Sequence, residues 1–233
     1  MRLSVLIPVH NERQTLHTIV ERVMRIAGPH EIIIVDDGST DGSRQIAEQL
    51  QEKYPESLRC CFHPRNMGKG AALRTAIAKA SGDVVMIQDA DLEYHPEDYP
   101  VALRLIEQGY ADAVYGSRFL GPHRAFFFWH YLGNRFLTFI CNLLTSGILT
   151  DMETGFKMLR TDTLKSLELS SSTFDIEVEI TMKLFRYGYR VYEIPITYTG
   201  RTYHEGKKVT WKDGVRALVA LVKWGLIIKP RAT

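Results

Sequence analysis

The chain has 233 residues, of which 45% are hydrophobic and 24% charged, and its formal net charge is +2. This length and composition fit one large globular domain with a full hydrophobic core. The near-neutral charge argues against a nucleic-acid-binding protein. The three cysteines Cys60, Cys61 and Cys141 form no disulfide framework, so we expect buried thiols and a reducing compartment.

Neither a signal peptide nor a transmembrane helix is expected. The first apolar run meets Pro8 and polar residues too early for a signal peptide. The longest uncharged stretch, 136–150, is shorter than the roughly 20 residues that a membrane span needs. We therefore expect a cytoplasmic protein in which this stretch forms a buried or interfacial helix.

The first half of the sequence alternates between short apolar runs and amphipathic segments. Strands are predicted at 2–9, 31–37, 58–63, 82–89 and 111–118. Between the first two, Leu16, Ile19 and Val23 recur at helical spacing. Strands that are apolar throughout and separated by helices favour a Rossmann-like α/β fold, with a mostly parallel central sheet and helices on both faces.

The second half is less regular and contains no repeat, linker or clear domain boundary. The predicted elements are a short strand within 153–160, a helix over 174–188, a strand over 189–198 and a helix over 213–228.

The C-terminal segment 211–233 is basic. Lys212, Arg216 and Lys223 recur near one face of its helix, and Trp211 and Trp224 flank it. This pattern predicts a basic amphipathic helix that either belongs to the main domain, residues 1–210, or lies in a membrane interface.

Acidic residues follow directly after two predicted strands. Asp36 and Asp37 end the second, and Asp89 and Asp91 follow the fourth. Ligands bind beyond the carboxyl ends of the strands in open α/β sheets. One acid of the Asp36–Asp37 pair would cap the next helix, which leaves the other for a base or ribose.

The segment QDADLE carries carboxylates at alternating positions. In an extended segment Asp89, Asp91 and Glu93 would point to the same side. Three converging acids repel one another unless a cation lies between them, and oxygen ligands suit Mg²⁺ or Mn²⁺. We therefore predict a divalent metal held by these three residues; the alternative is a solvated turn before a capped helix.

A glycine-rich segment, NMGKGAAL (66–73), opens a predicted helix. Its backbone amides would meet a phosphate or nucleoside. It is neither a Walker A loop nor a G-x-G-x-x-G after the first strand, which disfavours a dinucleotide-dependent oxidoreductase. Candidate cations for a pyrophosphate are Arg118, Arg135, Arg201, Lys207 and Lys208.

Together these segments resemble family 2 glycosyltransferases of the GT-A fold, and among them the polyprenol-phosphate sugar transferases. The resemblance extends over residues 2–210, and the order and spacing of the motifs are specific. The matching segments are IPVHNE (7–12), VDDGSTD (35–41), NMGKGAAL (66–73), DADLEYHPED (89–98), GSRF (116–119), DMETGFKMLR (151–160) and RTYHEGKK (201–208).

The resemblance implies roles for the matched residues. The nucleotide-binding set would be Pro8, His10, Glu12, Asp36, Asp37, Lys69, Gly70, Asp89 and Ala90. The catalytic set would be Asp91, Arg118, Asp151, Arg201 and Lys208. Asp151 and Glu153 would face the acceptor. The sequence departs from the family pattern at His10, at Glu93 and before Lys207, which leaves the sugar and the acceptor open.

The implied reaction is a metal-dependent, inverting transfer of a sugar from a nucleotide sugar of the GDP-mannose or UDP-glucose type to a polyprenyl phosphate. The protein would lie at the cytoplasmic face of a membrane, alone, as a homo-oligomer or with a membrane-protein partner. The alternatives are a glycosyltransferase with a soluble hydroxyl acceptor, a nucleotidyltransferase and a non-catalytic sugar-nucleotide binder. A phosphate acceptor needs no general base, whereas a hydroxyl acceptor would, with Asp151 as the first candidate.

Overall fold

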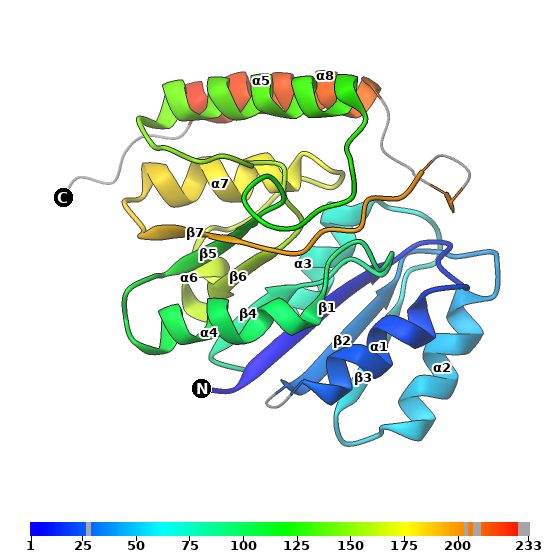
Figure 1. Cartoon of the computed structure of the whole chain (residues 1–233). Helices are drawn as coiled ribbons and strands as arrows, with labels where there is room; N and C mark the ends of the chain where they lie inside the picture. The colour runs from blue at the N-terminus through cyan, green and yellow to red at the C-terminus, as the bar shows by residue number, and fades with distance from the viewer. Residues whose placement is uncertain (27–28, 203–204, 207–210, 228–233) are drawn as a thin grey trace.

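The computed structural model describes the chain except for residues 27–28, 203–204, 207–210 and 228–233. The described residues form a seven-stranded sheet in the order β3-β2-β1-β4-β6-β5-β7 (Figure 1). The strands are β1 Leu3–Val9, β2 Pro29–Asp36, β3 Leu58–Phe62, β4 Val84–Ile87, β5 Ala113–Ser117, β6 Lys157–Arg160 and β7 Val191–Pro195. Strand β6 is antiparallel to β4 and β5, and the other pairs are parallel, so the predicted mostly parallel sheet is confirmed.

Helices cover both faces of the sheet, as predicted. They are α1 Leu16–Arg25, α2 Ser43–Lys53, α3 Lys69–Lys79, the 3₁₀ helix η1 Pro96–Asp98, α4 Tyr99–Glu107, α5 Phe128–Thr145, α6 Thr161–Ser166, α7 Ile176–Arg186 and α8 Trp211–Ile227. Successive side chains of a strand point to opposite faces. Val5 and Ile7 of β1 therefore join a core with α1, α2 and α4, whereas Leu6 joins a core with α3 and α7.

Two helices form a further layer outside α7. In Figure 1, α5 and α8 run side by side on the side of α7 away from the sheet. Helix α8 packs inward through Ala217, Leu221 and Trp224, which are buried. Trp224 therefore does not flank an interface as predicted, because its ring lies over the ammonium group of Lys183 at 4.7 Å. No helix of the described residues is long and apolar enough to cross a membrane.

The register of the parallel strands brings their carboxyl ends to one edge of the sheet. Val9 of β1 lies beside Asp36 of β2, and Leu6 lies beside Ile87 of β4. The amide of Asp37 continues this pairing by donating to the carbonyl of Val9 at 2.7 Å. The loops that carry the predicted acids therefore open onto the same edge.

Candidate active site

Arg201, which follows β7, joins two of the loops at this edge. Its guanidinium donates to both carboxylate oxygens of Glu12, at 2.8 and 3.2 Å. Its Nε donates to the backbone carbonyl of Asp91 at 2.8 Å, and its backbone amide donates to Glu93 Oε1 at 2.7 Å. Arg201 thus clamps the loop after β1 to the loop after β4, and brings together four of the predicted site residues.

The segment DADLE is a turn and not the extended segment that was predicted. Leu92 has a φ of +64°, in the left-handed region that a leucine rarely adopts. The turn directs Glu93 toward Tyr198, whose hydroxyl donates to Oε2 at 2.6 Å, while Oε1 accepts the amide of Arg201. Among the described residues no three His, Cys, Asp or Glu side chains are grouped to hold a metal ion. The expected three-carboxylate arrangement is thus absent from this part of the chain, because Glu93 is turned aside.

The carboxylate of Asp91 lies in a strongly negative environment. Burial raises its pKa to about 8, and the carboxylates of Asp89 and Glu93 act in the same direction. A carboxyl group that resists ionisation among other acids is stabilised as an anion by a nearby cation. Asp89 and Asp91 together fit Mg²⁺ or Mn²⁺, which proteins commonly hold through one or two carboxylates plus substrate phosphates.

The glycine-rich segment is held in place by hydrogen bonds and close packing within the protein. The carboxylate of Asp37 accepts the amides of Met67 at 2.9 Å and Gly68 at 2.7 Å. Gly68 has a φ of +97°, which requires glycine, and a Cβ at Gly70 would collide with a backbone oxygen of the 171–173 loop. The amides predicted to meet a phosphate are therefore partly used within the protein, and Gly70 serves close packing.

Asp36 and Asp37 have different surroundings. His63 Nδ1 lies 2.7 Å from Asp37 Oδ1, so both oxygens of Asp37 are engaged. Asp36 Oδ2 accepts the amide of Ser39 at 3.2 Å, whereas its buried Oδ1 has no hydrogen-bond partner among the described residues. Of the two acids, Asp36 has the acceptor available for a ligand. His10 Nδ1 lies 2.9 Å from the carbonyl of Asp37, which places it at the same loop.

Lys69, the first residue of α3, lies between two carboxylates. Its Nζ is 2.7 Å from Asp89 Oδ1 and 3.0 Å from Glu177 Oε1 of α7. Gly155 lies against the other oxygen of Asp89, where a Cβ would overlap it. Neither Glu177 nor Gly155 was predicted as a site residue. Glu177 carries no signal in the sequence, because it occurs in an ordinary amphipathic helix pattern.

Asp151 is fully buried and binds Arg118. Arg118 Nε donates to Oδ2 at 2.6 Å, and Nη2 donates to Oδ1 at 2.7 Å. Asn134 of α5 donates to Oδ1 at 3.1 Å. This fork occupies both oxygens, so the prediction of Asp151 as a general base is not supported by its geometry. Asp151 is placed to orient Arg118, whose guanidinium lies 5.4 Å from the ring centre of Tyr198.

The remaining predicted residues are distributed around this centre. Pro8 lies in β1 beside Val35, and Ala90 is buried in the turn that follows β4. Burial raises the pKa of Glu153 to about 7, and its Oε1 has no hydrogen-bond partner among the described residues. Lys207 and Lys208 lie outside the described residues.

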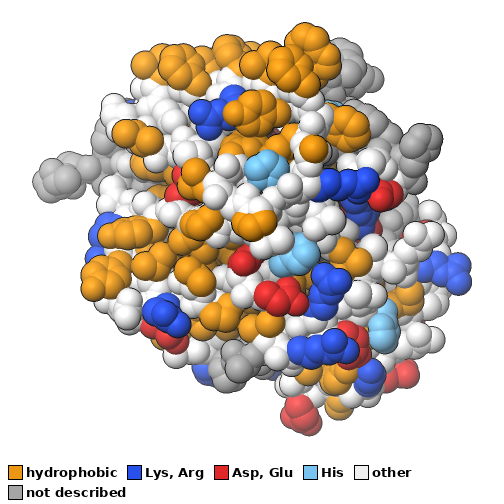
Figure 2. Space-filling view, in the orientation of Figure 1, with side chains coloured by type: hydrophobic (Ala, Val, Ile, Leu, Met, Phe, Trp, Pro, Cys, Tyr) orange, Lys and Arg blue, Asp and Glu red, His pale blue; other side chains and the backbone are white. Residues whose placement is uncertain are grey.

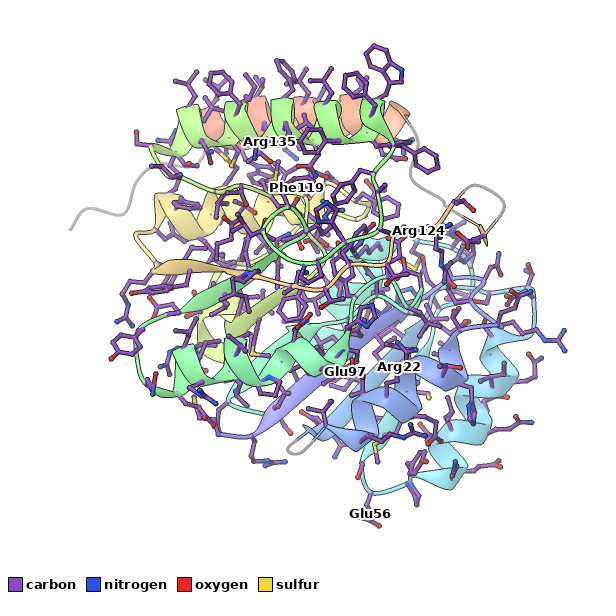
Figure 3. The ribbon with its side chains drawn as sticks, viewed as in Figure 1. Arg22, Glu56, Glu97, Phe119, Arg124 and Arg135 are labelled. Carbon is purple, nitrogen blue, oxygen red and sulfur yellow. The ribbon has the colours of Figure 1, made fainter. Side chains whose placement is uncertain are left out.

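Arg135 of α5 is also part of this region. It donates to the carbonyl of Thr150 at 3.1 Å, and its guanidinium lies 5.9 Å from the ring centre of Phe119. Figure 3 shows both side chains between α5 and the loop that follows β5. Arg135 therefore supports the loop that carries Asp151.

An α/β sheet that presents a D-x-D turn and basic side chains at the carboxyl edge of its strands is the architecture of the GT-A glycosyltransferases. The sequence model of Glycosyl transferase family 2 matches residues 4–167. The chain belongs to this family and is a glycosyltransferase, as the motifs predicted.

Two curated relatives match almost the whole chain. A dolichol-phosphate mannosyltransferase from Pyrococcus furiosus is 31% identical over 232 residues, which cover 96% of this chain and 64% of that protein. A polyprenol monophosphomannose synthase from Mycolicibacterium smegmatis is 29% identical, with 97% of this chain and 87% of that protein covered. The chain thus spans less than two thirds of the length of the Pyrococcus protein.

Solved structures show the same fold. Glucosyl-3-phosphoglycerate synthase from Mycobacterium tuberculosis in complex with UDP has a TM-score of 0.75 at 19% identity, covering 96% of this chain and 80% of that one. A mannosyltransferase from Pyrobaculum calidifontis in complex with GDP-Man and Mn²⁺ has a TM-score of 0.64 at 20% identity, covering 95% and 63%. The predicted GT-A fold is confirmed.

Proposed function

We propose that this glycosyltransferase transfers a hexose from a nucleoside diphosphate sugar to a polyprenyl phosphate, with mannose as the favoured hexose. The observation that carries the proposal is the negative turn at Asp89 and Asp91 flanked by Arg201 and Arg118, which offers a cation site and two phosphate-binding groups at one edge of the sheet. The two curated relatives, a dolichol-phosphate mannosyltransferase and a polyprenol monophosphomannose synthase, favour a lipid phosphate acceptor.

The donor half of the site would use the loops after β1, β2 and β4. Asp36 Oδ1 would accept a hydrogen bond from the base or ribose, beside Pro8 and His10. Asp89 and Asp91 would hold Mg²⁺ or Mn²⁺, which when bound supplies Lewis-acid neutralisation of the diphosphate. A metal contact from Glu93 would require loss of its hydrogen bonds to Tyr198 and Arg201, so we assign Glu93 to positioning.

The acceptor phosphate is an anion near neutral pH and would attack without a base. Its oxygen forms a bond to the anomeric carbon, the bond from that carbon to the diphosphate breaks, and the electron pair leaves with the nucleoside diphosphate. Attack from the face opposite the leaving group inverts the anomeric centre. Arg118 and Arg201 would stabilise the phosphates, together with Lys208 from the segment outside the described residues. Among the described hydrogen bonds Arg118 Nη1 has no acceptor, so the fork with Asp151 leaves this group for a phosphate.

A hydroxyl acceptor is the second candidate, and one observation favours it. Glu153 has a pKa raised to about 7 and an oxygen without a hydrogen-bond partner among the described residues, which suits a general base better than Asp151 does. The two acceptors predict different pH dependence. The rate of transfer to a hydroxyl should fall as the pH drops below about 7, because the general base Glu153 becomes protonated. The rate of transfer to a polyprenyl phosphate should not fall for this reason, because that reaction does not need an ionised Glu153.

We also propose that the outer surface of α5 and α8 rests on a membrane. On α5 the exposed side chains Trp129, Leu132, Phe136, Phe139 and Leu143 recur at three- and four-residue spacing and lie on one face. Figure 2 shows hydrophobic side chains gathered along this edge of the molecule. Burying such a stripe in an interface stabilises binding in proportion to its apolar area.

Helix α8 adds a second stripe. Val215, Val219, Val222 and Leu226 recur at the same spacing and are between 51% and 81% exposed. The exposed Arg216 and Lys223 lie on the same helix and would contact anionic head groups. Helix α8 would thus combine both alternatives, because it packs on α5 and α7 with one face and exposes an apolar stripe on another.

Vesicle flotation tests this surface. The double variant Phe139→Ser and Val219→Ser should lose binding to vesicles that contain anionic phospholipid. The matched control is Val101→Ser, which removes a side chain that is 54% exposed on α4. Equal flotation of the double variant and the control, or no flotation of the wild type, would exclude the membrane assignment.

A transfer assay tests the function. The protein is incubated with GDP-mannose or UDP-glucose, Mn²⁺ and polyprenyl phosphate, and the lipid product and the released nucleotide are identified. We expect a glycosylated lipid phosphate and free nucleoside diphosphate. Release of inorganic pyrophosphate from a nucleoside triphosphate would indicate a nucleotidyltransferase, and tight nucleotide-sugar binding without turnover would indicate a sensor.

A further inference from the structure

Glu177 is a buried carboxylate that the reaction described above does not use. It lies in the first turn of α7 and is 3% exposed. Its two oxygens contact two lysines from different parts of the fold. Oε1 is 3.0 Å from Nζ of Lys69 at the start of α3, and Oε2 is 2.6 Å from Nζ of Lys157 at the start of β6.

Lys157 connects Glu177 to the loop that holds Arg118. Lys157 is fully buried, and its Nζ also donates to the backbone carbonyls of Met152 and Thr154. These carbonyls belong to the turn that follows Asp151, the counter-ion of Arg118. The position of this turn therefore depends on an ammonium group whose only carboxylate contact among the described residues is Glu177.

Lys69 connects Glu177 to the metal and nucleotide side. Its other contact is Asp89 Oδ1 at 2.7 Å. Asp89, Lys69, Glu177 and Lys157 thus form a row of alternating charges that runs from the D-x-D turn to the 151–156 loop. Burial alone would raise the pKa of Glu177, but Lys157 and Lys69 hold it below its ordinary value, so the carboxylate stays ionised.

The shared carboxylate has a consequence for ligand binding. When a cation binds the carboxylate of Asp89, Lys69 loses one of its two carboxylate partners and keeps Glu177. Glu177 therefore holds the ammonium group of Lys69 at the same place, beside the incoming phosphate. A buried pair that served stability alone would need one lysine, and replacement of such pairs by apolar side chains is often neutral.

We propose that Glu177 is a positioning residue that fixes Lys69 for the nucleotide diphosphate and couples it, through Lys157, to the loop that presents Arg118. The inference rests on the proposed function, since it assigns Lys69 to the nucleotide. It makes the two halves of the site one energetically coupled unit, so that a change at one half alters the other.

The chain offers a matched control on the same helix. Glu179 is also fully buried on α7, and it pairs with Lys183 at 2.7 Å and accepts the amides of Ser170 and Ser171. Glu177→Gln and Glu179→Gln therefore remove equivalent buried charges. Only Glu177 contacts the row that leads to Asp89 and the 151–156 loop.

Hydrogen exchange of the ligand-free protein is the first measurement. In Glu177→Gln, exchange should accelerate both in 66–73 and in 150–156, which are far apart in sequence. In Glu179→Gln, the segment 150–156 should exchange as in the wild type. The segment 66–73 is no control for this variant, because the amide of Ala71 donates to Ser172 in the loop that Glu179 holds. Unchanged exchange at 150–156 in Glu177→Gln would overturn the coupling. If that variant does not fold, the double variant Glu177→Gln and Lys157→Met is used, because it also removes the buried ammonium group that Glu177 neutralises. Exchange at 66–73 should still accelerate in this double variant.

Nucleotide affinity is the second measurement, by calorimetry with GDP and UDP, with and without Mn²⁺. Glu177→Gln should weaken binding by about tenfold, and Glu179→Gln should not. In a Lys69→Met background the Glu177→Gln effect should disappear, because both changes act through one ammonium group. Additive losses, or equal losses in both glutamine variants, would overturn the proposal. A wild type that binds neither nucleotide would overturn the proposed function, and the exchange result would still decide the coupling.

Discussion

Asp91→Asn should stabilise the ligand-free protein while abolishing sugar transfer. Asp91 has a folded-state pKa of about 8, against 3.8 as its ordinary value. Between these two pH values the folded protein holds a proton that the unfolded chain has released. The free energy of unfolding therefore falls as the pH rises through this window. Above pH 8 the wild type has lost all the stability that ionisation of Asp91 costs. Asparagine cannot ionise, so the variant escapes this penalty.

The size of the effect follows from the same difference. One pKa unit corresponds to about 1.4 kcal/mol. Near pH 7, the upper bound on the gain in the free energy of unfolding from Asp91→Asn is therefore about 4 kcal/mol. Asp91 is partly exposed and solvent screens part of the repulsion, which lowers the expected gain to about 1–3 kcal/mol. For a domain of this size, that gain raises the melting temperature by roughly 3–10 °C.

Thermal unfolding measured from acid to alkaline pH checks this reasoning. The difference between Asp91→Asn and the wild type should grow with pH up to about 8 and vanish below the ordinary aspartate pKa. Asp162→Asn, which replaces an exposed acid on α6 outside this turn, is the control with which the difference is compared. Mn²⁺ with GDP should stabilise the wild type and not Asp91→Asn. A variant no more stable than the wild type at any pH, or one that retains Mn²⁺-dependent transfer, would refute the assignment.

Three further changes test other parts of the site. Asp151→Asn leaves Arg118 with a neutral partner and should lower transfer at least about tenfold without removing a pKa from the pH–rate profile, because Asp151 orients Arg118 and takes no proton. Gly155→Ala places a methyl group against Asp89 Oδ2 and should weaken Mn²⁺-dependent nucleotide binding, measured by calorimetry, by about tenfold. Tyr198→Phe removes the hydrogen bond to Glu93 and should cost about 1–2 kcal/mol in urea unfolding; an unchanged midpoint would contradict its bridging position.

Local patterns in the sequence predicted the architecture well. Apolar runs such as 31–37 and the helical spacing of Leu16, Ile19 and Val23 were sufficient, because strand and helix periods are local properties. The uncharged stretch 136–150 was predicted to be helical, but α5 begins earlier, at Phe128. The aromatic residues before 136 extend the outer stripe of that helix, which the absence of charge alone did not reveal.

The chemistry of the site was predictable only in part. The acids at strand ends predicted that their loops meet at one edge of the sheet, and the strand register confirms this, since parallel strands bring their carboxyl ends together. The alternation of Asp89, Asp91 and Glu93 was misleading, because the left-handed conformation of Leu92 turns the segment. A backbone conformation of this kind depends on its tertiary partners, here Tyr198 and Arg201, which are more than a hundred residues away.

The sequence by itself determined the α/β fold, the edge of the sheet where the acidic loops meet and the glycosyltransferase family, because these depend on local periodicity and on ordered motifs. Only the tertiary structure decided how each charge is used. Asp151 pairs with Arg118, Asp37 accepts amides of the glycine-rich loop, and Glu177 contacts two lysines. The physical reason is that a charge acquires its role from the partners that burial brings within about 3 Å, and those partners come from distant parts of the chain.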